Sequence, residues 1–288
     1  MKKSLQKKDD LQTKIERAIR LLRSASKKAE KLGQPVEICY SGGKDSDVIL
    51  ELAKMAGIDF RAIYKNTTID PPGTIKHCLD NGVEIIRRKS FAKVIQAKGF
   101  PTFNRRFCCS ELKEYKILEV AVQGIRRCES VKRNKRYREP TVCRLLGAKD
   151  KEVEIFLPIL DWSDNDVVSF IELQKIQCHP IYYDKDGAFN PTKRLGCMGC
   201  PLKSDRGLKE FKENPRLVKF WLRNGEIWWK THQIKKAKEK FNTPYEVFVN
   251  NIFFKSYEDF KNAIDDMFGH IDCKEFLQNY FKINLNSH

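Results

Sequence analysis

Apolar residues near the start of the chain follow first a helical and then a strand-like pattern. Over residues 10–32 they recur every three or four positions, as on one face of an amphipathic helix, and Gly33 and Pro35 end the pattern. The run at 36–40 predicts a buried strand, and the run at 47–53 predicts a following helix. The sequence therefore predicts a strand, a turn and a helix in succession.

Further strands are predicted at residues 60–64 and 83–87, each preceded by a helix-compatible segment. Strands that alternate with helices are typical of a parallel sheet. From residue 203 onward this pattern gives way to helical segments rich in tryptophan and lysine, and then to a Phe-rich tail. We therefore expect an α/β fold with a doubly wound, mostly parallel sheet and a helical C-terminal region.

A glycine turn joins the first predicted strand to its helix. Two adjacent glycines let backbone N–H groups approach an anion closely, and the helix N-terminus adds partial positive charge. An ordinary glycine turn with a helix cap has no need of a lysine and two serines here. The loop also lacks the Walker spacing of glycines, which disfavours a standard P-loop ATPase. We predict a different phosphate-binding loop, made of Ser41, Gly42, Gly43, Lys44, Asp45 and Ser46.

Four of the ten cysteines form two pairs. Cys108 and Cys109 are adjacent, and Cys197 and Cys200 form a Cys-x-x-Cys. Four thiolates suit tetrahedral zinc or an iron–sulfur cluster, because both prefer sulfur ligands. An adjacent pair spreads its sulfurs more readily around the separate irons of a cube than around one zinc ion. We expect a [4Fe–4S] cluster, with structural zinc, or cysteines without metal, as the alternatives.

The loop and the cysteine pairs together resemble the phosphoadenosine phosphosulfate (PAPS) and adenylyl-sulfate (APS) reductase family of the PP-loop ATP pyrophosphatase superfamily. The resemblance implies that an adenine nucleotide (PAPS, APS or ATP) binds at the loop beside the cluster. It also implies that Lys113, four residues past the second cysteine, is linked electrostatically to cluster and substrate. Residues 124–130 look like the Gly-x-Arg-x-x-Glu-Ser segment of that family, and residues 66–72 resemble its strand-end segment. The nucleotide contacts that follow from these matches are Asn66, Thr67, Arg126, Glu129, Ser130 and Arg133.

Two further stretches match the family, at residues 158–167 and 179–183. We expect both to be structural, with Ser163 capping a helix and Trp162 packing in the core. The expected domains are an N-terminal helix in 1–35, a nucleotide-binding and iron–sulfur domain in 36–205, and the helical region in 206–288.

The reductases carry a nucleophilic cysteine in a C-terminal Glu-Cys-Gly-Leu-His-like motif, which is absent here. The late cysteine is Cys273, without the Gly-Leu-His that follows in that motif. Three functions stay open. The first is a reductase that uses Cys273 or an external thiol or thioredoxin-like donor. The second is an ATP-dependent sulfur transferase that thiolates tRNA or DNA, and the third is a non-catalytic nucleotide or nucleic-acid binding module.

The net charge of +17 attracts phosphates, on a small nucleotide or on a polynucleotide alike. Nucleic acid is therefore an open partner. The charged N-terminus has no signal-peptide pattern, and no apolar run is long enough to span a bilayer. We expect a cytoplasmic protein without a membrane partner.

Overall fold

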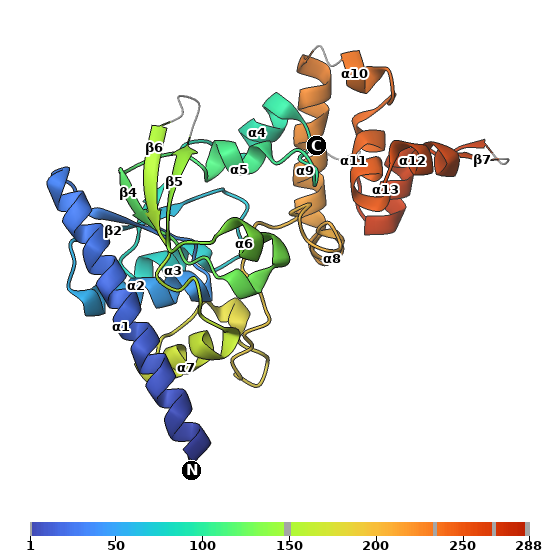
Figure 1. The fold of residues 1–288 in the computed structure, drawn as a ribbon. Helices are drawn as coiled ribbons and strands as arrows, with labels where there is room; N and C mark the ends of the chain where they lie inside the picture. Colours follow the sequence, from blue (N-terminus) through green and yellow to red (C-terminus); the bar gives the residue numbers. More distant parts are fainter. Residues whose placement is uncertain (1, 147–150, 233–234, 267–268, 286–288) are drawn as a thin grey trace. The chain divides into compact units, whose positions relative to one another are not determined.

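The computed structural model describes residues 2–146, 151–232, 235–266 and 269–285 (Figure 1). The chain divides into two compact units, each built from segments that are separate in the sequence. The first contains Met1–Asn66, Pro71–Arg88 and Glu114–Gly196, and the second contains Thr67–Asp70, Lys89–Lys113 and Cys197–His288. The sequence grouped the cysteine pairs with the glycine loop in 36–205. In the structure both pairs instead lie in the unit that contains the C-terminal helices.

The first unit is organised around a sheet that has six strands in the described part of the chain. Its order is β3-β2-β1-β4-β6-β5, and every neighbouring pair is parallel except β5 with β6. The connections run outward from β1 to β2 and β3, and then return to β4 on the other side of β1. The expected doubly wound, mostly parallel sheet is confirmed. The strands are β1 Val36–Tyr40, β2 Phe60–Lys65, β3 Glu84–Ile86, β4 Val120–Val122, β5 Thr141–Leu146 and β6 Lys151–Phe156.

Helices of the first unit pack on this sheet. Helix α1 is amphipathic, and its apolar face, from Leu11 to Ala29, is buried in the same core as β1 and α2. This packing agrees with the expected N-terminal helix. Short helical turns and α6 follow β4, and Ser163 caps α7 by accepting from the backbone N–H of Asp166 at 3.2 Å. The helices are α1 Lys2–Lys31, α2 Lys44–Ala56, α3 Thr74–Asp80, α6 Val131–Arg136 and α7 Asp164–Gln174, with 3-10 turns at Arg127–Glu129 and Pro180–Tyr182.

The second unit has its own aromatic core. Trp221 of the long helix α9 is 1% exposed and packs against Phe91, Phe100 and Phe211. The C-terminal helical region is confirmed, with one small addition, a pair of two-residue strands. Its elements are α4 Phe91–Lys98, α5 Phe107–Leu112, α8 Leu208–Glu213, α9 Pro215–Thr231, α10 Lys235–Lys238, α11 Pro244–Phe253, α12 Tyr257–Ile264, β7 Asp265–Asp266, β8 Gly269–His270 and α13 Cys273–Phe281.

A search of the described helices for one both long and apolar enough to cross a membrane found none.

Candidate functional site

The glycine loop lies where the strand order of the first unit reverses. Strands β1 and β4 are neighbours, and the chain leaves their carboxyl ends toward residues 41–46 and 123–124. Such reversal points in open α/β sheets are where ligands bind. The two segments approach closely, because a Cβ added at Gly124 would lie 2.9 Å from the carbonyl oxygen of Asp45.

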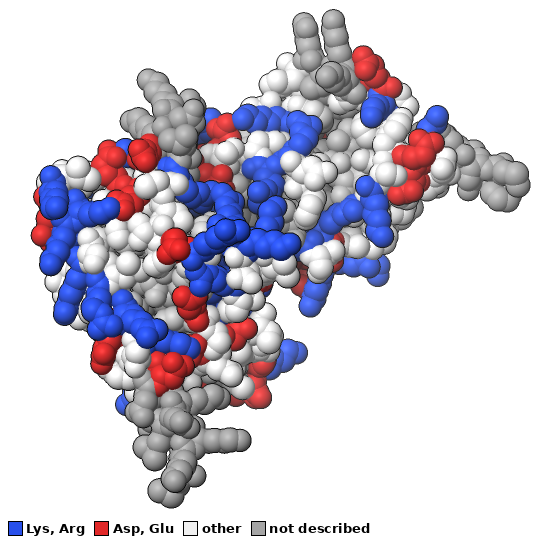
Figure 2. All heavy atoms as spheres, viewed as in Figure 1, with Lys and Arg blue, Asp and Glu red and all other residues white. Residues whose placement is uncertain are grey.

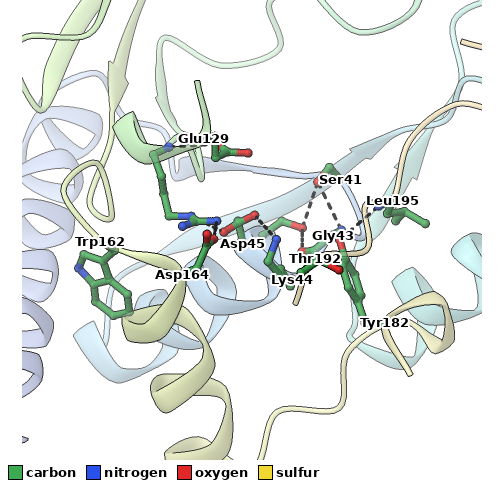
Figure 3. Close-up of polar contacts among 12 residues, drawn as sticks. Ser41, Gly43, Lys44, Asp45, Glu129, Trp162, Asp164, Tyr182, Thr192 and Leu195 are labelled. Carbon is green, nitrogen blue, oxygen red and sulfur yellow. Dashed lines mark hydrogen bonds and ion pairs between the residues drawn. The ribbon is translucent and has the colours of Figure 1, made fainter. Parts of the chain in front are cut away.

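The loop has the geometry of an anion cradle. Gly42 has φ = +77°, a conformation that other residues rarely adopt, and α2 begins at Lys44, three residues earlier than its apolar pattern suggested. The two serines brace the turn. Ser46 Oγ donates to the carbonyl oxygen of Gly43 at 2.7 Å and accepts from Ser41 Oγ at 3.2 Å (Figure 3). The loop thus leads directly into the N-terminus of α2, where a helix carries partial positive charge.

Three cations reach one cleft around this loop. Lys44 is 6% exposed, with its ammonium 5.6 Å from the centre of the Tyr182 ring and 3.4 Å from Oδ2 of Asp45 (Figure 3). Arg133 of α6 and Arg194 line the same cleft. Burial lowers the pKa of Arg133 below its usual value, and the charge of Arg194 acts in the same direction. The cleft is lined by Cys39, Ser41, Gly43, Lys44, Asp45, Ser46, Gly124, Glu129, Arg133, Tyr182, Arg194 and Leu195.

The cleft measures about 220 Å³, less than the roughly 300–1,000 Å³ of pockets that enclose a whole small ligand. It therefore suits an anionic part of a ligand. Sequence reasoning missed Arg194 and treated Tyr182 as structural. The hydroxyl of Tyr182 accepts from the backbone N–H of Leu195 at 3.3 Å, and burial raises its pKa to about 12.

Arg126, which the sequence predicted as a nucleotide contact, is not among the residues that line this cleft. Its side chain is 1% exposed. Nε donates to Oδ1 of Asp45 at 2.7 Å, and Nη2 donates to Oδ1 of Asp164 at 2.8 Å. Arg126 is thus occupied in holding Asp45 at the loop rather than open to a ligand anion. Figure 3 shows Asp164 and Asp45 together at this position.

Glu129 and Ser130, both predicted as nucleotide contacts, have different positions in the structure. Glu129 lines the cleft, pairs with Arg133 and accepts from the backbone N–H of Arg126 at 3.3 Å. Ser130 caps α6, where its hydroxyl accepts from the backbone N–H of Arg133 at 3.1 Å. Ser130 therefore contributes by fixing α6, not by lining the cleft.

The strand-end residues do not line the loop cleft. Asn66 continues β2, and its backbone N–H donates to the carbonyl oxygen of Ile86 at 2.8 Å. Thr67 belongs to the other unit, is 1% exposed, and donates from Oγ1 to Oδ2 of Asp70 at 2.6 Å. Its Oγ1 is also 3.7 Å from Sγ of Cys197. Thr67 therefore lines the pocket of the paired cysteines, and its contact with a nucleotide stays a prediction.

A buried polar network lies on the core side of the loop, and no sequence pattern pointed to it. Nε2 of His77 is 3.0 Å from Oδ1 of Asp47 and 2.9 Å from the Tyr40 hydroxyl, which also bonds to Asp47. Oδ2 of Asp47 is a buried atom without a hydrogen-bond partner among the described residues. His179 packs edge-to-face on His77 at 5.6 Å. Because Asp47 is in the first turn of α2, this network ties the loop to the core.

The four paired cysteines line a single pocket in the second unit. Cys108 and Cys109 come from α5, Cys197 and Cys200 come from the loop before α8, and Trp221 closes the pocket. A hydrogen bond that the Cys108 thiol donates to Cys109 raises its pKa above the usual value, and burial and the other paired thiols add to this. The two pairs, distant in the sequence, thus line one pocket. Within the described residues, no group of three or more His, Cys, Asp or Glu side chains is arranged to hold a metal ion.

Lys113 lines the same pocket, as its place in the sequence predicted. Desolvation works against its charge, but the neighbouring Cys197 and Asp70 outweigh it and hold the pKa of the ammonium above its usual value. Lys113 therefore stays a cation beside the thiols. Such a cation would offset the negative charge of thiolates or of a cluster.

Cys273 is poorly suited to be a nucleophile. It is 4% exposed at the start of α13, and burial raises the pKa of its thiol to about 12, with Glu246 and Asp272 adding to the effect. A reactive cysteine needs access and a lowered pKa. The expectation of a catalytic Cys273 is not supported by this environment.

Comparisons with known proteins agree with this arrangement. Residues 35–203 match the model of the phosphoadenosine phosphosulfate reductase domain. Two uncharacterized proteins of Methanocaldococcus jannaschii are similar, one 30% identical over 75% of this chain and 53% of that protein, the other 27% identical over 70% and 47%. The chain spans about half the length of these relatives.

Solved structures that align with part of the chain have low sequence identity. One is an FMN adenylyltransferase of Candida glabrata in complex with FAD and inorganic pyrophosphate, with 15% identity and a TM-score of 0.46 over 66% of this chain and 64% of that one. Another is a phosphoadenylyl-sulfate (PAPS) reductase of Candida auris in a phosphate complex, with 14% identity and a TM-score of 0.42 over 62% and 87%.

The matching domain runs from β1 to just beyond Cys200, and so contains the glycine loop and both cysteine pairs. This confirms the resemblance drawn from those motifs, and the chain belongs to the phosphoadenosine phosphosulfate reductase domain family.

Proposed function

We propose that this protein is an enzyme of sulfur metabolism that binds the phosphates of an adenine nucleotide (PAPS, APS or ATP) in the loop cleft. The observation that carries the proposal is the convergence of Lys44, Arg133 and Arg194 on a glycine loop at a helix N-terminus. Cations and N–H groups aimed at one small cleft stabilise a phosphate chain and any charge that develops on it during transfer.

The thiol pocket supports a [4Fe–4S] cluster held by Cys108, Cys109, Cys197 and Cys200. The support is the chemistry of the donors, four thiols on one pocket with a cation, Lys113, among them. A cluster there would supply electrons or a sulfur-binding iron. The part of this chain's own residues is to hold the group and to balance its charge.

Binding is the first test of the proposal. Lys44→Ala should lower the affinity for each nucleotide that binds about 10- to 100-fold, because a charge-assisted hydrogen bond contributes roughly 1.5–3 kcal/mol. Lys54→Ala is the matched control, because Lys54 is at the other end of α2 and pairs with Glu51. Titration calorimetry with PAPS, APS and ATP provides the measurement. Equal affinity in wild type and Lys44→Ala would sink the assignment of the cleft.

The reaction is tested by what is consumed. Reduction of PAPS or APS takes two electrons from a thiol or thioredoxin-like donor and releases sulfite and the adenosine phosphate. Sulfur transfer driven by ATP instead releases pyrophosphate when the acceptor oxygen is adenylylated, and then AMP when sulfur replaces it. Anaerobically purified protein incubated with each nucleotide separates the two. Binding without turnover of any of them would indicate a non-catalytic module.

One observation favours the ATP-dependent sulfur transferase as the second candidate. The burial and raised pKa of Cys273 remove the obvious protein nucleophile for attack on a sulfonyl sulfur. We expect Cys273→Ser to leave turnover of whichever nucleotide is consumed within about twofold of wild type. Loss of sulfite release in this variant, with the fold intact by circular dichroism, would restore the reductase with a protein thiol.

A further inference from the structure

Helix α6 presents an uncompensated basic face. Lys132, Lys135 and Arg136 are three and four residues apart, so they share one side of the helix, and all three are exposed. Exposed Arg138 follows directly, and no acidic residue occurs from Val131 to Arg138. Within the described residues, no carboxylate pairs with these four side chains, whereas many other basic side chains of the unit pair with one. On the face that Figure 2 shows, Lys and Arg cover much of the surface.

This basic face is held rigidly. Ser130 caps the first turn of α6, and Tyr137, directly after the helix, is 6% exposed in the core. Arg127 braces the end of the helix, since its Nε donates to the carbonyl oxygen of Tyr137 at 2.8 Å while its Nη1 pairs with Asp161. A short helix fixed at both ends presents its charges without the ordering cost that flexible side chains on a loose segment would carry.

The same helix also reaches the nucleotide cleft. Arg133 lies one residue from Lys132 but faces inward, where it lines the cleft with Lys44 and Arg194. A polyanion that lies along the outer face of α6 would therefore pass next to the cleft opening. A basic face that only kept the protein soluble would not need to lie next to the cleft. Its position beside Arg133 therefore favours a binding role.

We propose that the outer face of α6 (Lys132, Lys135 and Arg136), together with Arg138 two residues beyond the helix, binds the phosphate backbone of a nucleic acid strand. Two of the four are arginines, whose planar guanidinium binds phosphate through two hydrogen bonds. A membrane partner is disfavoured, because a membrane surface would also bind exposed apolar side chains. Among the described residues of α6, Val131 is the one large apolar side chain that is exposed. The strand would be the acceptor in the second candidate function, and its role as acceptor rests on that function. Binding of the strand to α6 is a separate property, because it needs no adenine nucleotide.

The test uses the full chain and labelled single-stranded RNA and DNA of one sequence, with fluorescence anisotropy as the readout. The triple variant Lys132→Glu, Lys135→Glu and Arg136→Glu should bind at least one of the two oligonucleotides at least tenfold more weakly. The slope of log K against log salt should also become shallower by about two, because each lost phosphate contact removes about 0.7 from it. The matched control, Arg17→Glu, Arg20→Glu and Lys27→Glu, makes the same charge change on the exposed side of α1.

Selective loss in the α6 variant supports the proposal, and the arm that binds more tightly, RNA or DNA, identifies the polymer. Equal loss in both variants would overturn it, because binding would then follow net charge. Tighter binding of poly-glutamate than of either oligonucleotide would also overturn it in favour of an acidic protein. Lys44→Ala should leave oligonucleotide binding unchanged, so a failed nucleotide site and a failed α6 surface give different results.

Discussion

Two arginines seven positions apart show how differently one residue type is used at this site. Arg126 is enclosed by Asp45 and Asp164, whereas Arg133 reaches the cleft. In the sequence both match a family segment, and both were predicted to contact the nucleotide. Whether such an arginine positions a loop residue or is free to bind a ligand depends on its burial and its ion pairs. Both depend on the fold, so the sequence match could not distinguish the two roles.

Matched substitutions should separate these roles. Arg126→Gln should lower the free energy of unfolding by about 2 kcal/mol, because it removes a buried guanidinium that pairs with both Asp45 and Asp164. Arg133→Gln should leave unfolding within about 0.5 kcal/mol of wild type but weaken nucleotide binding about tenfold. Urea unfolding and titration calorimetry measure the two quantities. The assignment fails if Arg126→Gln weakens binding while its stability is unchanged.

His179 should make stability depend on pH. Burial lowers its pKa below the usual 6.5, and the adjacent His77 acts in the same direction. As the pH falls through 6.5, His179 therefore becomes protonated in the unfolded chain but stays neutral in the folded one. The contribution of His179 to stability should be complete above pH 6.5 and should be lost as the pH falls below it. Urea midpoints at pH 7.5 and 5.5 measure the effect.

His179→Asn is the comparison for that pH effect. Asn keeps an acceptor for the backbone N–H of Ile181, which Nδ1 of His179 now binds at 3.1 Å. The variant should lose less stability than wild type between the two pH values. An equal loss in both proteins would mean that other groups cause the pH effect.

At the scale of elements, helices α4 and α9 pack through small residues. A Cβ at Gly225 of α9 would lie 2.1 Å from the ring of Phe100, and one at Gly99, after α4, would lie 2.7 Å from the ring of Trp228. Each glycine thus makes room for an aromatic ring of the other segment. Neither contact could be predicted from the sequence, because periodicity identifies a buried face but not its partner.

Gly225→Ala should therefore destabilise the second unit although alanine is the better helix former. The added methyl forces Phe100 out of its place at a cost of about 1–3 kcal/mol, against a gain of roughly 1 kcal/mol in helix propensity. Thermal unfolding followed by tryptophan fluorescence reports mainly on this unit, which contains Trp221, Trp228 and Trp229, whereas Trp162 lies in the first. Gly196→Ala is the control, since an added Cβ there meets open space. A raised melting temperature in Gly225→Ala would contradict the packing argument.

Prediction from the sequence succeeded where a pattern is local. Strand β1 and the loop after it, Ser163 as a cap, and the cysteine pairs all rest on residues close together in the chain or of rare type. It failed for Arg194 and Tyr182, which reach the cleft from an irregular segment without periodicity. The strands β4, β5 and β6 were not predicted either, and β4 has only three residues.

At the scale of the whole molecule, the two units share the chain in an interleaved way. The expected boundary after residue 205 would leave α4 and α5 in a fragment without α8, α9 and α11, against which the core residues of α4 and α5 are packed. A fragment of residues 1–205 should therefore lose cooperative unfolding of the thiol unit and expose apolar surface, although it keeps the loop and all four paired cysteines.

Dye binding and near-ultraviolet circular dichroism of that fragment, beside the full chain, measure this loss. Failure to bind a hydrophobic dye, together with thiols as protected from alkylation as in the full chain, would show that residues 36–205 fold as the sequence first suggested.

The interleaving also has a consequence for the order in which the protein is made. Cys108 and Cys109 leave the ribosome long before Cys197 and Cys200, and Trp221, which completes the wall of their pocket, follows later still. The glycine loop can be enclosed by its sheet earlier, because its unit ends at Gly196. During synthesis the first cysteine pair therefore remains without the other two cysteines of its pocket until the segment from Cys197 to Trp221 has been made.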